Sequence, residues 1–163
     1  MSDVSVSNWP VSIEVQRSDE LSCECPSDHL LAQWARAGLE SADNNEALTI
    51  RIVDEAEIRS CNKQWRGKDS ATNVLSFTAD FPPEAGVNYL GDMMVCAEVL
   101  KRESAEQSKT LNDHWAHIVV HGVLHLRGFD HENELDAAIM EEREKEILAT
   151  LGVADPYRDE IDT

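Results

Sequence analysis

The sequence predicts one α+β domain, in which about five helices pack on a small, mixed, four-stranded sheet around a central helix that carries histidines. Three observations lead to this expectation. The 163 residues suit a single domain with a proper core, with residues 1–10 and 153–163 as flexible ends. Hydrophobic residues make up 42% and charged residues 28%, as in ordinary globular proteins. Alternating and helical stretches follow one another in the order βαβαββααα, which is typical of helices packed over a sheet.

The first three elements are a strand, a helix and a second strand. Residues 11–15 and 48–52 alternate between apolar and polar side chains, which predicts the two strands. Between them, Ser27 is placed to cap a helix. The apolar side chains of this helix lie on one side, which would face the core: Leu30, Leu31, Trp34, Ala35 and Leu39.

A second helix, a third strand and a fourth strand follow. Asp54 and Glu57 have the spacing of a capping box, so they predict the start of a helix that ends near Gly67. Residues 73–77 and 91–96 predict the third and fourth strands. Two prolines and a glycine between these strands predict a loop.

Three helices complete the chain. Residues 98–107 predict the first, Thr110 opens the second, and residues 134–151 predict the last. The last helix should bury a stripe of apolar side chains: Leu135, Ile139, Met140, Ile147, Leu148 and Leu151.

Three histidines in the second of these helices and just beyond it, His121, His125 and His131, follow the spacing H-x3-H-x5-H. The first two are four residues apart, so in a helix their rings lie on one face and can point at a common atom. Gly128 stands where a helix commonly ends in a left-handed residue, which lets the chain reverse and bring His131 back. Three neutral imidazoles converging in this way predict a site for Zn²⁺, with one position open for water or substrate.

The alternative is that these are hydrogen-bonded core histidines, as single histidines in apolar helices usually are. The helix is apolar almost all round, so it should be buried, and a buried imidazole needs partners for its ring nitrogens. A metal and a nearby acceptor supply them. Three such residues, among only 6 histidines in the chain, therefore favour a metal site. Three imidazoles would also accept Ni²⁺, Co²⁺ or Cu²⁺.

Cysteine usage and the start of the chain favour the cytoplasm. The four cysteines show no disulfide pattern, which is usual in a reducing compartment. Cys23 and Cys25 could bind a metal, but no second pair accompanies them, so we expect a minor structural role. The first residues lack the features of a secretory signal, and no apolar run approaches the roughly 20 residues of a membrane span. We therefore expect no membrane partner.

The net charge of −18, taken alone, argues against binding a polyanion. The distribution of charge changes this conclusion. Much of the acid lies in residues 132–146 and 155–162. Four of the 14 basic residues fall within ten positions: Arg59, Lys63, Arg66 and Lys68. An acidic shell with one basic strip is compatible with a localised anion site.

The chemistry expected of an open zinc site is hydrolysis, because the ion lowers the pKa of its water to about 7 and polarises a carbonyl or phosphoryl oxygen. In H-E-x-x-H metallopeptidases a glutamate follows the first histidine as general base. Gly122 stands at that position here, which disfavours peptide hydrolysis. Arg66, before the third strand, can clamp a phosphodiester and stabilise its developing charge, although a surface salt bridge is the commoner role of an arginine.

Four stretches of the sequence stand out. They are a basic turn (Arg66–Asp69), the entry to a predicted strand (Thr72–Phe77), a Leu-Gly-Asp sequence (Leu90–Asp92) and the segment with the three histidines (His121–His131). Together they resemble the YbeY family of bacterial and organellar metal-dependent endoribonucleases. The resemblance runs in order from about residue 11 to about residue 151. The first ten residues, the region around Cys23 and the acidic tail have no clear counterpart.

The resemblance implies a zincin-like α+β fold with one zinc held by His121, His125 and His131. It makes Arg66 and His121 the expected catalytic residues. It further implies cleavage of single-stranded RNA, with roles in maturing the 3′ end of small-subunit (16S) ribosomal RNA and in ribosome quality control. The expected setting is the cytoplasm, with the ribosome or small-subunit proteins as partners.

Four more residues are candidates for supporting the metal ligands or for contacting RNA. His117 shares the helix face of the first two ligands by its spacing. Asp130 could accept the free N–H of His131, or it could simply cap a turn. Lys68 and Asn73 could contact RNA, and Asn73 could instead build the entry to the third strand.

Two other functions stay open. One is a ribosome-associated assembly factor with a structural zinc, which would be expected to have a fourth protein ligand. The other is a zincin-type peptidase with its base at a different position.

Overall fold

The computed structural model describes residues 12–21, 23–40, 46–81 and 88–157. Some predicted features lie outside this part: residue 11 of the first strand, part of the loop after the third strand, and residues 1–10 and 158–163 of the two ends. The elements are β1 (Ser12–Arg17), α2 (Asp28–Leu39), β2 (Ala47–Val53), α3 (Glu55–Arg66), β3 (Val74–Thr78), β4 (Tyr89–Cys96), α4 (Ala97–Glu106), α5 (Leu111–Leu126) and α6 (Glu134–Thr150). Their order confirms the predicted α+β class.

The predicted helix caps are confirmed. The side chains of Ser27, Asp54 and Thr110 each accept a hydrogen bond from the backbone N–H three residues further on, at 3.2, 2.9 and 3.1 Å. Such caps satisfy an otherwise unpaired N–H in the first turn and typically stabilise a helix by about 1 kcal/mol. Gly67 ends α3 in the left-handed conformation, with φ of 73°.

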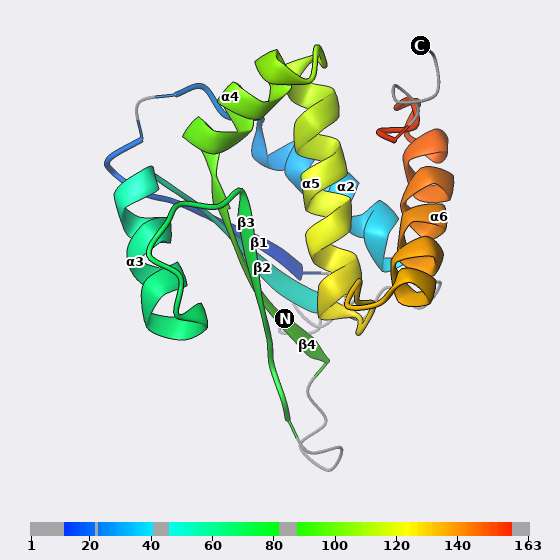
Figure 1. The fold of residues 1–163 in the computed structure, drawn as a ribbon, viewed down its shortest axis with the longest axis horizontal. Helices are drawn as coiled ribbons and strands as arrows, with labels where there is room; N and C mark the ends of the chain where they lie inside the picture. Colours follow the sequence, from blue (N-terminus) through cyan, green and yellow to red (C-terminus); the bar gives the residue numbers. More distant parts are fainter. Residues whose placement is uncertain (1–11, 22, 41–45, 82–87, 158–163) are drawn as a thin grey trace, which may run out of the picture.

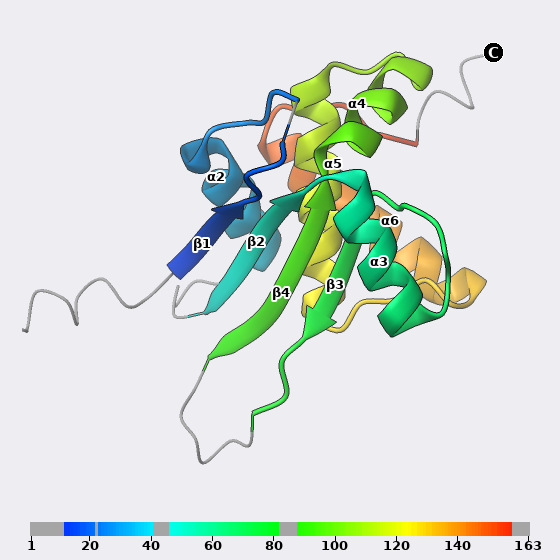
Figure 2. The ribbon, with the colours of Figure 1, turned by 90° about the vertical axis from the view of Figure 1, so that its left-hand side faces the viewer.

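The sheet is mixed, with the strand order β1-β2-β4-β3 (Figure 2). Strands β1, β2 and β4 pair in parallel, whereas β3 is antiparallel to β4. In this sheet β3 is an edge strand with a single neighbour. Its other edge is therefore available to border a cleft.

Helix α5 lies on one face of the sheet, with α2 and α6 beside it (Figure 1). Its Val119, Val120 and Val123 are fully buried in one core with Ile50 of β2 and Met93 of β4. Burying one such side chain is worth roughly 1.5–3 kcal/mol. The helix that carries the histidines is thus fixed to the sheet by the main core, as predicted.

The opposite face of the sheet is covered only in part. Helix α3 lies on that side (Figures 1 and 2). A second, smaller core joins α3 to the sheet and to α4: Val53, Ile58, Leu75, Cys96 and Val99. This packing holds the C-terminal end of α3 beside the edge strand β3.

The predicted buried stripe of α6 is partly wrong. Leu135 and Ile139 are 70% and 51% exposed. The residues of α6 that are buried include a carboxylate: Met140, Glu144, Ile147 and Leu148. Because apolar residues occur on more than one side of this helix, its composition does not reveal which side faces α5. In the described part of the chain, no helix is long and apolar enough to span a membrane.

Candidate metal centre

The end of α5 and the turn after it position the three predicted ligands. His121 and His125 stand one turn apart near the C-terminal end of α5. Gly128 has a φ of 101°, a left-handed conformation that favours glycine, and its N–H donates to the carbonyl of His125 at 3.0 Å. This bond occupies a free carbonyl at the helix end while the chain turns back. His131 thereby returns to the two helical histidines.

The three imidazoles converge. The ring centroids lie 4.7 Å apart for His121 and His125, 4.9 Å for His125 and His131, and 5.6 Å for His121 and His131. One nitrogen of each ring lies within 4.8 Å of the others, and no further His, Cys, Asp or Glu joins this group within the described residues. Burial and the two neighbouring imidazoles lower the pKa of His125, so its ring stays neutral and keeps a lone pair. This donor set suits a zinc-like ion.

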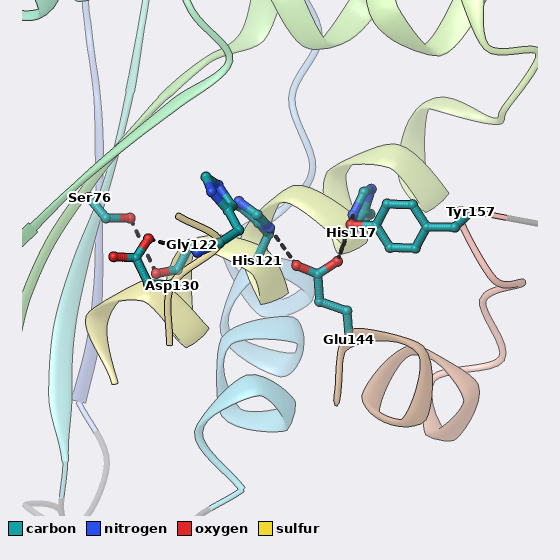
Figure 3. Close-up of polar contacts among 8 residues, drawn as sticks. Ser76, His117, His121, Gly122, Asp130, Glu144 and Tyr157 are labelled. Atoms are coloured by element: carbon teal, nitrogen blue, oxygen red, sulfur yellow. Dashed lines mark hydrogen bonds and ion pairs between the residues drawn. The ribbon is translucent and has the colours of Figure 1, made fainter. Parts of the chain in front are cut away.

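Glu144 supports the group from α6. Its side chain is fully buried, and it accepts a hydrogen bond from Nδ1 of His121 (Figure 3). Since Nδ1 is engaged, Nε2 of His121 is the ring atom left for an ion. The carboxylate also bonds Nε2 of His117 at 3.1 Å and accepts from the hydroxyl of Tyr157 at 2.5 Å.

The carboxylate of Glu144 is charged despite its burial. Burial acts to raise its pKa, but the hydrogen bonds and charges of His117 and His121 outweigh this effect and lower the pKa to about 2. The pKa of Tyr157 is raised, first by burial and then by its bond to Glu144, so the phenol remains a donor. Burial also lowers the pKa of His117, although Glu144 opposes this shift.

His117, His121 and Glu144 form a second group whose ligand atoms lie within 4.8 Å of one another. Here both carboxylate oxygens already bond ring nitrogens directly. The ring nitrogens that face Glu144 are used in these hydrogen bonds, so they are not available to an ion. The group is therefore better described as a support for His121 than as a second metal site.

Sequence reasoning missed Glu144 and Tyr157. The sequence did contain a signal for Glu144. Met140, Glu144 and Leu148 are spaced by four residues, which places the glutamate on the same helix face as two apolar side chains and so predicts that it is buried. Tyr157 lies beyond α6, in the end predicted to be flexible. Val153 from the same segment packs against the main core.

A cleft of about 790 Å³ opens beside the histidines. One wall is formed by β3 and the segment before it, including Arg66, Lys68 and Asn73. The other wall is formed by the end of α5 and the turn after it, including the three predicted ligands and Asp130. Residues that are far apart in the sequence, such as Arg66 and His131, thus line one open, polar cleft.

Arg66 is anchored at the rim of this cleft. Its Nη2 donates to the backbone carbonyl of Ser76 at 2.7 Å, and its guanidinium lies 5.5 Å from the centroid of the Phe77 ring. It forms no ion pair with a carboxylate in the described part of the chain, so the salt-bridge alternative has no partner there. The guanidinium has five N–H donors, and those not used by Ser76 remain for a ligand.

Gly122, between His121 and the sheet, is a point of close approach. A Cβ at this position would lie 2.2 Å from Sδ of Met93. The hydroxyl of Ser76 donates to the carbonyl of Gly122 at 3.2 Å, which ties β3 to α5 next to the first histidine. A glutamate at position 122, the place of the base in H-E-x-x-H peptidases, would collide with the sheet.

The other candidate residues lie as follows. Asp130 accepts a hydrogen bond from the backbone N–H of His131 at 2.7 Å, as in a turn. The amide of Asn73 donates to the carboxylate of Glu103, although Asn73 also lines the cleft. Lys68 lines the cleft and is exposed. His117 does not line it and lies on the far side of His121, against Glu144 (Figure 3).

Fold and site together define an α+β protein in which three converging histidines, a group that could hold a metal ion, line an open polar cleft. The model of the family described as endoribonuclease YbeY matches residues 15–152. The chain belongs to this family, which confirms the resemblance found in its motifs.

Individual relatives and a solved structure agree. Endoribonuclease YbeY of Pseudomonas fluorescens is 47% identical over 151 residues, covering 92% of this chain and 98% of that protein. The protein of the same name from Stenotrophomonas maltophilia is 48% identical over 156 residues, covering 93% and 97%. The solution structure of TM1509 from Thermotoga maritima is similar in fold, with a TM-score of 0.54 at 21% identity, covering 94% of this chain and 99% of that one.

Proposed function

We propose that this chain is a zinc-dependent endoribonuclease that cuts single-stranded RNA in the cleft between Arg66 and the three histidines. Its family makes it a hydrolytic enzyme that cleaves RNA internally. The observation that carries the proposal is that Arg66, His121 and His125 line one cleft, although they come from two different helices. We further propose that it matures the 3′ end of small-subunit (16S) ribosomal RNA and serves ribosome quality control, in the cytoplasm and as one domain.

His121, His125 and His131 would hold the zinc. When bound, the ion would act as a Lewis acid toward a phosphoryl oxygen and activate a water molecule for attack. Glu144 holds the ring of His121 in one orientation and one tautomer, because its charged carboxylate accepts from Nδ1. His121 thus links the metal position to a buried anion that raises the basicity of the ligand.

Arg66 would bind the scissile phosphodiester. Its contacts with Ser76 and Phe77 restrain the side chain before RNA arrives, so little rotamer freedom remains to be lost on binding. Its remaining N–H donors can bond phosphate oxygens and stabilise the negative charge that builds up during attack. Lys68 adds a second cation on the same wall of the cleft.

Two observations support this proposal over the alternatives. The three histidines lack a fourth ligand among the described His, Cys, Asp and Glu residues, and structural zinc sites are usually closed by four. This favours catalysis over a purely structural zinc in a ribosome assembly factor. A side chain at position 122 would meet Sδ of Met93, which disfavours a peptidase base there. Ribosomal partners would help a chain of net charge −18 to approach RNA.

The test is cleavage of a single-stranded ribosomal RNA fragment by zinc-loaded wild type, His125→Ala and Arg66→Ala, prepared in parallel. Two matched controls lie on α2, away from the cleft: His29→Ala and Arg36→Ala, both at exposed positions. We expect wild type and both controls to cut, and both cleft variants to lose activity while staying folded. Equal cleavage by all five proteins would trace the activity to a contaminating nuclease and contradict the proposal.

A further inference from the structure

Trp65 is an exposed aromatic side chain at the C-terminal end of α3. It is 64% exposed, whereas Trp34 and Trp115 are 6% and 0% exposed. Among the described residues it is the most exposed aromatic side chain, followed by Phe81 at 49%. An indole left in water gains nothing from core packing. Its exposure therefore favours a role in binding rather than in the core.

The cations around Trp65 have no carboxylate partner among the described residues. Lys63, Arg66 and Lys68 form no ion pair with a carboxylate in the described part of the chain. Arginines elsewhere do form such pairs: Arg17, Arg51, Arg59, Arg102, Arg127 and Arg143. In a chain with 32 acidic and 14 basic residues, three cations within six positions thus have no carboxylate partner in the described part. This is the local charge that a polyanion needs.

Trp65 does not line the cleft itself, but it lies next in the chain to Arg66 and about one helical turn after Asn62, which both do. Its neighbour Arg66 lines the cleft and bonds the carbonyl of Ser76. The hydroxyl of Ser76 in turn bonds the carbonyl of Gly122, beside His121. The C-terminal ends of α3 and α5 lie toward the same end of the sheet, with β3 between them (Figure 1). RNA that extends out of the cleft past Arg66 comes to this end of α3, where the indole is exposed.

We propose that Trp65 stacks on an unpaired base of the RNA next to the scissile phosphate, with Lys63 and Lys68 bound to the flanking backbone. This subsite rests on the proposed function and extends it. Proteins hold single strands with aromatic rings that stack on bases and with cations that follow the phosphates. A paired base in a duplex has no free face to offer, so the subsite selects single-stranded RNA.

Helix stability explains only part of this arrangement. Lys63 and Arg66 lie in the last turn of α3, where cations favour the helix dipole. Lys68 lies beyond the helix end, and the dipole gives no reason for an exposed indole. RNA binding accounts for all three features.

The experiment measures binding of a fluorescently labelled single-stranded RNA of eight nucleotides, and of a duplex of the same sequence, by anisotropy. All proteins carry His125→Ala, so that the RNA is not cut. Trp65→Ala should weaken single-strand binding by about tenfold, the scale of one lost base stack, while Trp65→Phe keeps most of it. Phe81→Ala, the matched exposed aromatic, should leave binding unchanged, and none of the changes should affect the weak duplex binding.

Tryptophan fluorescence gives an independent readout. All proteins in this measurement also carry Trp9→Phe, which leaves Trp34, Trp65 and Trp115 as the tryptophans. RNA should quench the emission of the His125→Ala protein, and Trp65→Phe should remove this quenching, because Trp34 and Trp115 are buried. Unchanged affinity in Trp65→Ala, or an equal loss in Phe81→Ala, would overturn the subsite. Neither outcome would affect the proposed function, which fails instead if zinc-loaded wild type leaves the RNA intact.

Discussion

Glu144 lies on helix α6, and its fully buried carboxylate accepts a hydrogen bond from Nδ1 of His121 on helix α5. The same carboxylate bonds His117 and Tyr157. The ring of His121, a candidate metal ligand, is therefore oriented by a residue of α6 rather than by its own helix. The affinity of the centre should depend on α6 and on the segment after it.

The first prediction concerns this carboxylate. Glu144→Gln keeps the size of the side chain but removes the charge that stabilises the His121 ring. We expect zinc affinity to fall by about 10- to 100-fold, as for other residues that hold metal ligands. Competition with a chromophoric chelator measures this directly, without reference to RNA cleavage. Glu141→Gln, an exposed glutamate of the same helix, is the control, and equal affinity in both variants would contradict the prediction.

Local patterns predicted the elements, because the caps at Ser27, Asp54 and Thr110 and the alternation of the strands depend on near neighbours. The convergence of the histidines was predictable for the same reason. Two of them share a helix face, Gly128 turns the chain back, and all three lie within a stretch that runs only from His121 to His131. What the sequence did not reveal depends on packing between distant segments.

Helix α6 illustrates this limit. Its apolar residues suggested a stripe that included Leu135 and Ile139, yet both are exposed. The face that packs on α5 is set by the tertiary fit, and it brings Glu144 to His121 across 23 positions. The cleft likewise joins Arg66 of α3 to histidines of α5, and only the relation of both helices to the edge strand β3 makes them neighbours.

The second prediction concerns the contact between α5 and β4. Gly122→Ala adds a Cβ that would meet Sδ of Met93 at 2.2 Å, so either the buried Met93 side chain or the backbone of one element must shift. We expect the free energy of unfolding to fall by about 1–3 kcal/mol, the usual effect of overpacking. Urea denaturation gives this value. Met93→Ala should be less harmful in the Gly122→Ala background than in wild type, whereas strictly additive losses would show that the two residues do not clash.

The third prediction is a pH dependence of stability that arises from Glu103. Burial acts to raise the pKa of this carboxyl, but the bonds with His114 and Asn73 outweigh burial, so the pKa falls below its ordinary value of 4.5. A carboxyl with a lowered pKa in the folded state contributes stability above pH 4.5 and loses it as the pH falls through the folded-state pKa.

Glu103→Gln tests this contribution. At pH 7 the variant should be less stable than wild type by about 1–3 kcal/mol, the scale of hydrogen bonds to a charged group. The difference should shrink as the pH falls below 4.5. Urea denaturation of both proteins from pH 7 to pH 3 measures it. Glu106→Gln, an exposed residue of the same helix, should behave as wild type. A difference that stays constant with pH would assign the effect to shape rather than charge.

The fourth prediction separates the charge of Arg66 from its geometry. Arg66→Lys keeps the positive charge, but an ammonium cannot lie flat on Phe77, bond the carbonyl of Ser76 and still present a planar pair of donors to a phosphate. If the guanidinium stabilises the transition state, kcat on a single-stranded RNA should fall by about 100-fold with a smaller change in KM. The melting temperature should not change, because the side chain is exposed. Arg36→Lys on α2 controls for the substitution itself. A kcat close to that of wild type would mean that a point charge at this rim is sufficient, and the phosphate clamp proposed for Arg66 would have to be abandoned.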